Sequence, residues 1–449
     1  MKERTVVLEE TIVKLAEAKK YASLRDFLAT LNPVDIAGAF GSLSEQALPL
    51  VFRLLPKELA AETFVEMETE QQQVLIRGFS DSELKAVVEE LYVDDAVELV
   101  EEMPANVVSR ILAQADPDTR KMINEILQYP EDTAGSVMTT EFVELQGSWS
   151  AQQAIEHIRK VGVDKETINT CYITGRTHKI KGVVSMRTLI LADPETKCEE
   201  LMSTSPVTVQ TLEDQETVAQ MFAKYNFQAL PVVDSDNRLL GIVTMDDAID
   251  IMEDETTEDM EKMAAMTPSD KPYLSTGVFD LFKNRIPWLV ILMLAASVTG
   301  WIIQGFQNTW LVTTALIAYI PMLMDTGGNA GSQTNVSVVR SLSIQELEFS
   351  DLPAVMWKEL RVSLLCGLTL ALLSFAKLML LDHVGFAVSL AVSLALVCTI
   401  LVAKLLGCLF PMAAKKLGLD PALASSPVVT TLADILSLLL YFLIAGALV

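Results

Sequence analysis

Hydrophobic residues recur at three- and four-residue spacing through the first 130 residues, and prolines and aspartates punctuate the pattern. This periodicity predicts a series of short amphipathic helices. The segments at 54–60 and 102–108 resemble each other, because each places a proline near the first turn of its predicted helix. Such repetition favours a small helical solenoid over residues 1–130, and an irregular helical bundle fits the pattern nearly as well.

A tandem repeat that mixes strands and helices follows between residues 131 and 252. Val137-Met138-Thr139 and Leu201-Met202-Ser203 begin the two copies, 64 residues apart. Each copy predicts a strand, a helix, and then two strands joined by a turn. The predicted strands include 142–145, 180–185, 206–209, 229–234 and 240–244, and the helices are 151–160 and 213–225. We therefore expect two small α/β domains, at 131–198 and 199–252.

Acidic residues crowd the predicted helix at 246–262. Five of them share one face at three- and four-residue steps: Asp247, Asp250, Asp254, Glu258 and Glu261. Like charges at this spacing destabilise a helix unless a cation or a basic partner lies against them. A solvated connector is the alternative interpretation. The position of the segment, between the repeat and the first membrane span, favours a cation-binding connecting helix within residues 246–275.

Five apolar stretches in the last third of the chain approach the roughly 20 residues that cross a bilayer. They are 288–304, 310–324, 362–381, 384–403 and 428–449, and the second and fourth continue further. Lysines and arginines occur in the loops after the second and fourth stretches and are absent from the loops after the first and third. The positive-inside rule then places the N-terminal region in the cytosol and the C-terminus outside. We expect a five-helix membrane domain over residues 284–449.

The charge of the chain is concentrated before this membrane domain. Asp and Glu outnumber Lys and Arg by 59 to 34, and −24 of the net −25 falls in the first 286 residues. An acidic soluble part disfavours nucleic acid and favours divalent cations, although solubility alone also explains an acidic surface. The five cysteines form no CxxC pair, which argues against a zinc site or a disulfide framework. The N-terminus has no apolar leader, so we expect the soluble part to stay in the cytosol.

Polar residues interrupt the second predicted span after Pro321. Three glycines and two amides fall within seven residues, in the segment 327–333 with the sequence GGNAGSQ. At membrane depth such a stretch is tolerated where broken backbone lines a cavity or is buried against protein. We expect carbonyl groups freed in this way to line a cation pathway. Close packing of helices through small residues is the alternative interpretation.

A lone carboxylate, Asp434, lies inside the last predicted span, where a charge costs at least about 2.5 kcal/mol. Thr430 and Thr431 lie within one helical turn of it. Such an oxygen-only environment favours Mg²⁺-like ions and excludes soft-metal chemistry. One carboxylate is few for a site, so we expect a homodimer to place two copies of Asp434 around a mostly hydrated ion. A structural aspartate bonded to a neighbouring helix is the alternative.

The tandem repeat resembles a pair of CBS domains, and the match covers both copies. CBS modules commonly bind adenine nucleotides through a Ser or Thr and an Asp three residues later. The second copy has Thr244 and Asp247 at these positions, and the first has Ser185 followed by Thr188. The resemblance therefore implies at most one good nucleotide site, at Thr244 and Asp247, with ATP as a second ligand.

The chain as a whole resembles the MgtE family of magnesium channels. The similarity rests on the 321–333 segment, the CBS pair, the preceding helical region, and the 418–423 segment (GLDPAL) that leads into Asp434. It implies a mainly α-helical homodimer in the bacterial inner (plasma) membrane. Each subunit would have a superhelical N-terminal domain, a CBS pair and five transmembrane helices. It also implies Mg²⁺ uptake down its electrochemical gradient, and closure of the pore by cytosolic Mg²⁺ bound between the helical domain, the CBS domains and the connecting "plug" helix.

This resemblance assigns roles to individual residues. Asp434 would be the pore carboxylate, Asn329 belongs to the family motif, and Asp420 would lie at the inner mouth. The sensor ligands would come from the connecting helix, the second CBS domain and the helical domain: Asp247, Asp250, Glu255, Glu258, Asp259, Glu216, Asp94, Asp95 and Glu98. Asn226 stands where some members have an acid, so we expect one sensor ion to be weaker or absent.

Two other functional classes compete with this one. An intramembrane aspartyl protease would use two membrane aspartates, but the GxGD motif is absent, because Asp434 follows Thr431-Leu432-Ala433. A metalloprotease would need HExxH, and the three histidines are isolated. We therefore expect no enzyme activity. A nucleotide-regulated transporter for another solute is the second rival, and comparing Mg²⁺ with ATP as ligands of the cytosolic part would separate the two.

Overall fold

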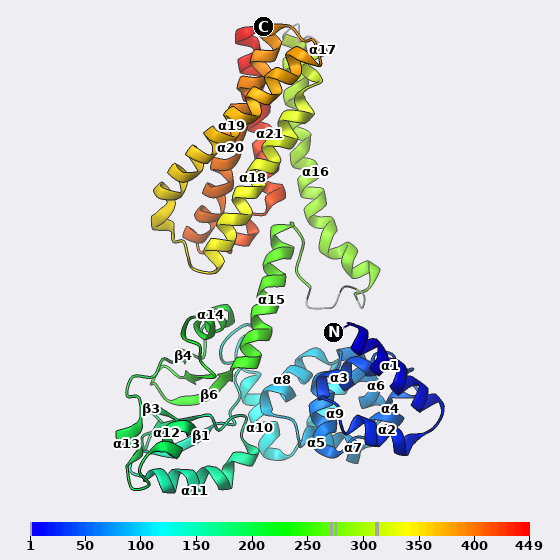
Figure 1. Ribbon diagram of the computed structural model, residues 1–449, viewed down its shortest axis with the longest axis vertical. Helices are drawn as coiled ribbons and strands as arrows, with labels where there is room; N and C mark the ends of the chain where they lie inside the picture. Colours follow the sequence, from blue (N-terminus) through cyan, green and yellow to red (C-terminus); the bar gives the residue numbers. More distant parts are fainter. Residues whose placement is uncertain (1, 270–272, 274–275, 310–313) are drawn as a thin grey trace. The chain divides into compact units, whose positions relative to one another are not determined.

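The computed structural model describes residues 2–269, 273, 276–309 and 314–449. It divides into two compact units, Met1–Met252 and Glu253–Val449 (Figure 1). Helices dominate both units, as the sequence predicts, and strands occur in the part of the first unit that carries the tandem repeat.

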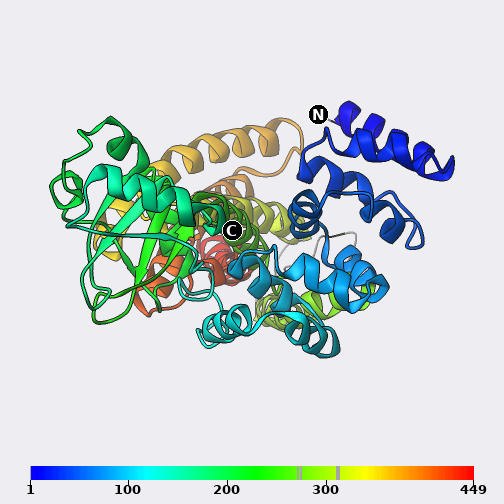
Figure 2. The ribbon, with the colours of Figure 1, turned by 90° about the horizontal axis from the view of Figure 1, so that it is seen from below.

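The first unit begins with ten short helices that stack in alternation. Helix α1 packs on α3, α3 on α5, α5 on α7, and α7 on α9, while α4 packs on α6 and α8 on α10. Figure 2 shows these helices following one another as an array. This stacking confirms the helical solenoid. The helices are α1 (Lys2–Glu17), α2 (Tyr21–Leu28), α3 (Pro33–Phe40), α4 (Leu48–Phe52), α5 (Lys57–Val65), α6 (Thr69–Gly78), α7 (Asp81–Val88), α8 (Val93–Glu102), α9 (Ala105–Gln114) and α10 (Pro117–Ile126).

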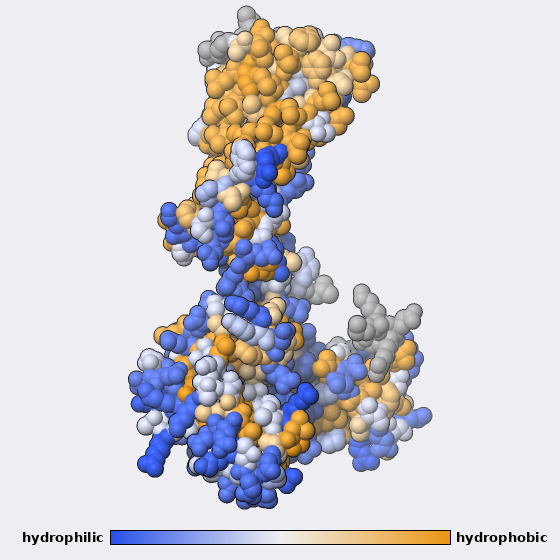
Figure 3. Space-filling model, turned by 60° about the vertical axis from the view of Figure 1, so that its left-hand side comes forward, coloured by the Kyte–Doolittle hydropathy of each residue, from blue (hydrophilic) through white to orange (hydrophobic). Residues whose placement is uncertain are grey.

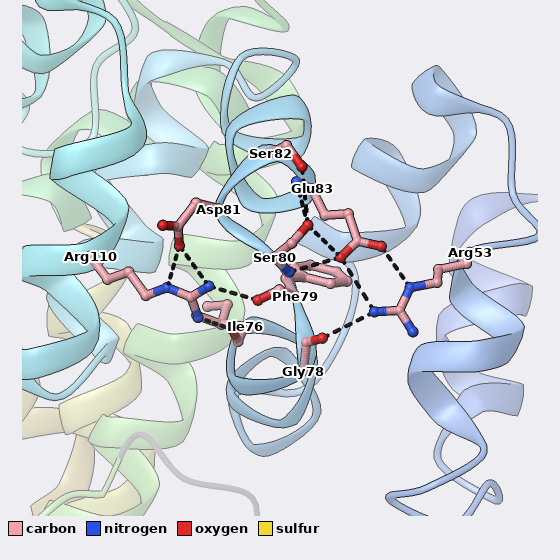
Figure 4. A network of polar contacts seen from close by, with 9 residues as sticks. All are labelled: Arg53, Ile76, Gly78, Phe79, Ser80, Asp81, Ser82, Glu83 and Arg110. Carbon is pink, nitrogen blue, oxygen red and sulfur yellow. Dashed lines mark hydrogen bonds and ion pairs between the residues drawn. The ribbon is translucent and has the colours of Figure 1, made fainter.

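Two arginines fasten consecutive layers of this array to the turn between α6 and α7 (Figure 4). Arg53, after α4, donates from Nε to Glu83 Oε1 at 2.6 Å and from Nη2 to the Gly78 carbonyl at 3.0 Å. Arg110, on α9, donates from Nη2 to the Phe79 carbonyl at 2.6 Å and to Asp81 Oδ1 at 3.0 Å. Carbonyl groups that the end of α6 leaves without helical partners are thus satisfied by charged donors.

The tandem repeat forms two three-stranded sheets, in the orders β1-β2-β3 and β4-β5-β6. In each sheet the first two strands pair in parallel and the last two pair antiparallel. Capping by Ser150 and Asp214 begins the two covering helices, α11 (Ala151–Val161) and α14 (Gln215–Tyr225), close to the predicted limits. The strands are β1 (Val143–Gln146), β2 (Thr170–Thr174), β3 (Ile180–Ser185), β4 (Val209–Gln210), β5 (Ala229–Val233) and β6 (Leu239–Thr244), with short helices η1 (Gly162–Asp164), α12 (Met186–Leu191) and α13 (Cys198–Leu201).

The acidic segment is helical, as predicted, and forms α15 (Met245–Met263), which begins in the first unit and ends in the second. The second unit continues with long apolar helices, and on the face that Figure 3 shows their surface is largely hydrophobic toward the top and mixed with hydrophilic residues further down. Within the described residues, four helices are long and apolar enough to cross a membrane. The helices are α16 (Val278–Thr309), α17 (Thr314–Ile317), α18 (Ile320–Ser343), α19 (Leu352–Leu380), α20 (Phe386–Lys416) and α21 (Ser426–Leu448), with short turns η2 (Phe349–Asp351) and η3 (Pro421–Leu423).

The second predicted span differs from the other four. Its first residues, 310–313, lie outside the described part, and the remainder forms α17 and α18. Helix α18 is not among the four apolar helices, because its sequence is rich in Gly, Ser, Thr and Asn. It nevertheless packs extensively on α20 and α21, so it belongs to the bundle.

The prediction of broken backbone in the GGNAGSQ segment is wrong. Helix α18 runs unbroken from Ile320 to Ser343, and its buried glycines contact neighbouring helices. A Cβ added at Gly327 would come within 2.5 Å of Thr399 Cγ2 on α20, and one at Gly328 within 3.3 Å of Thr430 Cγ2 on α21. The alternative interpretation, close packing through small residues, accounts for these glycines.

Candidate functional site

A stripe of polar side chains runs along the face of α18 opposite to the glycines. Asp325, Asn329 and Gln333 recur every four residues and are exposed, whereas Gly327 and Gly331 are buried. Asn329 Nδ2 donates a hydrogen bond to Asp325 Oδ2 at 3.3 Å. A helix packed among membrane spans thus presents carboxylate and amide groups on a face that its own subunit leaves open.

Asp434 lies beside this stripe, on the half of α21 that packs against α18. Gly328 and Thr430 bring the two helices together one turn before Asp434, and the Asp434 carboxylate interacts electrostatically with that of Asp325. Asp434 itself is half-buried. Thr430 and Thr431 Oγ1 both donate to the Pro427 carbonyl, at 2.9 and 2.8 Å, within the first turns of α21. Two carboxylates and an amide therefore share one side of the bundle.

A buried ion pair lies within the bundle, and the sequence analysis did not identify it. Lys404 Nζ on α20 lies 3.5 Å from Glu359 Oε2 on α19 and donates to Thr334 Oγ1 on α18 at 3.1 Å. The Lys404 side chain is 7% exposed and that of Glu359 18%. Lys404 directly follows the predicted limit of the fourth span. A charged residue in the continuation of an apolar helix is a signal that could have identified it.

Acidic residues from distant parts of the first unit line a second candidate site, a cavity of about 460 Å³. Asp94 and Asp95 come from α8, Asp246 and Asp247 from the start of α15, and Glu166 from the loop before β2. No Lys or Arg occurs among the described residues that line the cavity. Glu166 was not predicted from the sequence, because it stands alone in a polar loop.

Burial and mutual repulsion raise the pKa values of these carboxyl groups. Burial, together with the negative charge of Asp247, raises the pKa of Asp95 to about 7. Burial and the charge of Asp95 raise the pKa of Glu166 to about 8. Burial and the charge of Asp247 also raise the pKa of Asp94. Glu98 is not among the lining residues but interacts with Asp95 and Asp247, and burial and the charge of Glu102 raise its pKa to about 7. Uncompensated carboxylates of this kind hold protons or bind a cation.

Two observations bear on whether this cavity fits a metal ion. Asp94 Oδ1 and Glu166 Oε2 are buried oxygens that have no hydrogen-bond partner in the structure. On the other hand, the described part of the chain contains no group of three His, Cys, Asp or Glu side chains placed to hold a metal ion directly. Oxygen donors at wider spacing fit Mg²⁺ that keeps several of its waters.

The other predicted sensor residues are not among the described residues that line this cavity. Asp250 follows Asp247 on α15 in the first unit, and Glu216 on α14 accepts a hydrogen bond from Gln220 Nε2 at 3.0 Å. Glu255, Glu258 and Asp259 belong to the second unit, on the last turns of α15. Asp420 also lies in the second unit, where its Oδ1 accepts from the Ala422 amide at 2.8 Å at the start of η3.

The two residues predicted for a nucleotide, Thr244 and Asp247, contact each other. Thr244 Oγ1 donates to Asp247 Oδ2 at 2.5 Å, and Asp247 faces the acidic cavity. A different cavity of about 290 Å³ lies between the two sheets of the repeat, lined by Thr170 and Ser185 from the first copy and by Asn226 and Phe227 from the second. Ser185 Oγ lies 2.8 Å from Thr188 Oγ1, the residue that replaces the usual Asp.

Comparison with known proteins matches each part of the chain. Residues 320–444 match the profile of a divalent cation transporter family, MgtE, residues 31–132 match the MgtE intracellular N domain, and residues 198–254 match the CBS domain. The magnesium transporter MgtE of Thermus thermophilus is 37% identical over 443 residues, which are 97% of this chain and 98% of that protein. The magnesium transporter MgtE of Bacillus subtilis is 30% identical over 451 residues, covering 99% and 98% of the two chains.

Two solved structures each resemble about half of the chain. The crystal structure of the cytosolic domain of the Mg²⁺ channel MgtE in complex with ATP aligns with a TM-score of 0.51 and 35% identity, covering 54% of this chain and 99% of that one. The soluble part of a magnesium transporter aligns with a TM-score of 0.53 and 28% identity, covering 56% and 99%.

Proposed function

Because this chain belongs to the MgtE family of divalent cation transporters, we propose that it carries Mg²⁺ across a membrane and that Mg²⁺ on the cytosolic side closes the path. Residues 284–449 would form the pathway, and residues 1–130 together with the CBS copies at 131–198 and 199–252 would sense the ion. The membrane would be the inner (plasma) membrane of a bacterium, with the N-terminus inside and the C-terminus outside.

The polar stripe of α18 is the observation that carries this proposal. Asp325, Asn329 and Gln333 are exposed on one subunit, although they lie on a helix packed among apolar spans. Polar groups at this depth are stable when they face water or a second protein surface, and not lipid. A homodimer that joins two such faces would line an aqueous path with two copies of the stripe and of Asp434.

The chemistry of the stripe favours a hard divalent cation. Every polar donor atom toward the ion would be oxygen, from Asp434, Asp325 and the amide of Asn329. Mg²⁺ releases its waters reluctantly and needs few carboxylates, which suits a wide, two-sided path that accepts a hydrated ion. The carboxylates would concentrate the ion at this level, and continuous α18 would provide a rigid wall.

Feedback by cytosolic Mg²⁺ would use the acidic cavity of the first unit. Without a divalent cation, Asp95, Asp247 and Glu166 repel one another, which weakens the contact between α8 and α15. With the ion bound, the same carboxylates would be bridged and α15 held in place. Since α15 continues into the second unit, ordering its first turns would restrain the end that lies nearest the bundle.

Flux measurements on purified protein in liposomes that contain a Mg²⁺-sensitive dye would test the pathway. We expect Mg²⁺ entry with the natural chain and its loss with Asp434→Asn, which keeps the size of the side chain and removes its charge. Asp280→Asn, at the exposed start of α16, is the matched control and should conduct normally. Growth of a magnesium-uptake-deficient bacterium should follow the same order. Normal flux through Asp434→Asn would overturn the assignment of the pore carboxylate.

An adenine nucleotide is a second ligand to be tested. The cavity between the two sheets favours this, because Ser185 and Thr170 offer hydroxyl groups and Phe227 an aromatic face beside a space of about 290 Å³. The acidic cavity near Thr244 and Asp247 would repel phosphate. Isothermal titration with ATP should therefore lose its signal in Ser205→Trp, at the rim of the cavity, and keep it in Ser235→Trp, in the turn between β5 and β6. Retained binding in Ser205→Trp would exclude this cavity.

A further inference from the structure

A lysine lies among the carboxylates at the end of α15. Lys262 Nζ is 2.7 Å from Glu258 Oε1 on the preceding turn and 2.8 Å from Asp420 Oδ2, in the loop between α20 and η3. The Lys262 side chain is 19% exposed, less than the 38% of Glu258 and the 32% of Asp420. The Lys262 side chain is therefore more covered than that of either carboxylate partner.

The carboxylate of Asp420 is itself fixed in place. Its Oδ2 accepts from Lys262, while its Oδ1 accepts from the Ala422 amide at 2.8 Å and so caps η3. After η3 the chain enters α21, the helix that carries Asp434. Lys262 thus connects α15 to the segment that begins a helix of the proposed pathway.

Neighbouring contacts hold the same turn of α15 against the bundle. Asp259 Oδ2 accepts a hydrogen bond from Ser343 Oγ, at the end of α18, at 2.8 Å. Burial raises the pKa of Asp259, the bond from Ser343 opposes the shift, and the charge of Asp420 adds to it. Two carboxylates, from Glu258 and Asp420, therefore pair with the ammonium group, and a third, from Asp259, interacts with it electrostatically.

We propose that Lys262 is a positioning residue, a tethered cation that holds the end of α15 on the loop before α21 when no Mg²⁺ is bound. It does so by occupying carboxylates that a divalent cation would otherwise bridge. The docked state, with the end of α15 held on the loop before α21, is then already populated without Mg²⁺. Only the effect of this docking on Mg²⁺ flux rests on the proposed function. Removing the ammonium leaves three carboxylates unneutralised, so docking then depends wholly on added divalent cation.

An ordinary surface ion pair would not have this effect. Exposed pairs contribute little, because solvent screens them and two long side chains lose freedom. Lys283 and Asp280 at the start of α16 are such a pair, 3.6 Å apart and 71% and 56% exposed. Lys262 differs in having two carboxylate partners, both at shorter distance, and a largely covered side chain.

Amide hydrogen exchange of full-length protein in nanodiscs tests the proposal, with the peptide that covers residues 256–263 as the readout. In EDTA we expect Lys262→Met to exchange about tenfold faster than the natural chain at this peptide, since a charge-assisted contact is lost. Added Mg²⁺ should restore its protection. Lys262→Arg, which keeps the charge, and Lys283→Met, the matched control, should behave like the natural chain in EDTA.

Asp420→Asn provides an independent second variant. Asparagine keeps an oxygen that accepts from the Ala422 amide but removes the charge that faces Lys262, so we expect faster exchange in EDTA here too. Unchanged exchange of Lys262→Met in EDTA would overturn the proposal. Faster exchange that Mg²⁺ does not reverse would also overturn it, because the lysine would then be a mere packing element. If Mg²⁺ flux were absent while these exchange results held, the proposed function would fail and the role of Lys262 would stand.

Discussion

Gly407 on α20 contacts Gly331 on α18 so closely that a Cβ added at Gly407 would lie 2.5 Å from the Gly331 carbonyl oxygen. The same Cβ would lie 3.2 Å from the Asn335 amide nitrogen. Asn335 in turn donates from Nδ2 to the Ala424 carbonyl, just before α21, at 2.7 Å. The contact of two backbones thus fixes the position of α18, and with it the direction in which the polar stripe faces.

Gly407→Ala should therefore destabilise the membrane unit. The atom that the new methyl group meets is backbone, which cannot rotate away, so the cost should be about 1–3 kcal/mol, typical of overpacking. Thermal unfolding in detergent would measure it. Gly300→Ala on α16 is the control, since nothing lies within 4 Å of a Cβ there. Equal melting temperatures for the two variants would contradict the packing account.

Replacing one partner of the Lys404–Glu359 ion pair should destabilise the protein more than replacing both partners. Lys404→Met leaves Glu359 largely buried with only Thr334 as a partner, and we expect a loss on the order of 3 kcal/mol. Lys404→Met combined with Glu359→Met should recover much of that loss, because no uncompensated charge remains. A double-mutant cycle on thermal stability measures the coupling. Lys377→Met, in the more exposed pair with Asp382, should have little effect, and additive losses in the cycle would exclude the coupling.

The acidic cavity, together with Glu98, whose carboxylate interacts with Asp95 and Asp247, predicts a pH dependence whose sign is set by raised pKa values. Asp95, Glu98 and Glu166 hold protons in the folded state up to about pH 7, 7 and 8, whereas the unfolded chain loses them near pH 4. In EDTA, the melting temperature should accordingly be highest near pH 5 and fall as the pH rises from 5 to 8.5. The rise in melting temperature caused by Mg²⁺ should be larger at pH 8 than at pH 5.5.

Glu98→Gln combined with Glu166→Gln should flatten this dependence, because the amides do not ionise. Differential scanning calorimetry at several pH values, with and without Mg²⁺, supplies the comparison. A Mg²⁺ effect that is as large at pH 5.5 as at pH 8 would contradict binding to these carboxylates.

Feedback should be lost when the acidic face of α15 is neutralised. We expect Asp247→Ala combined with Asp250→Ala to keep conducting at high internal Mg²⁺, because the carboxylates through which Mg²⁺ would hold α15 in place are gone. Patch recording or liposome flux over a range of internal Mg²⁺ would show it. Asp118→Ala combined with Glu125→Ala removes the same charge from exposed positions on α10 and should close normally. Closure of the α15 variant at the natural Mg²⁺ level would show that the sensor lies elsewhere.

Much of the architecture was already determined by the sequence, because local periodicity and membrane thickness are properties of short segments. The repeat predicted both sheets and the limits of α11 and α14, since capping residues Ser150 and Asp214 act on their own helices. Asp434 stood out for a similar reason, because one carboxylate in an apolar span is conspicuous without any knowledge of its neighbours.

Tertiary structure alone decided which residues meet. From the sequence, the glycines of α18 predicted broken backbone, with close helix packing as the alternative. The contacts of Thr399 and Gly407 with these glycines decided for packing. Glu166, Glu359 and Lys262 carry no local signal of their roles, since each acquires its role only from a partner far along the chain. Charge interactions depend on distance and burial in three dimensions, and a linear pattern specifies neither.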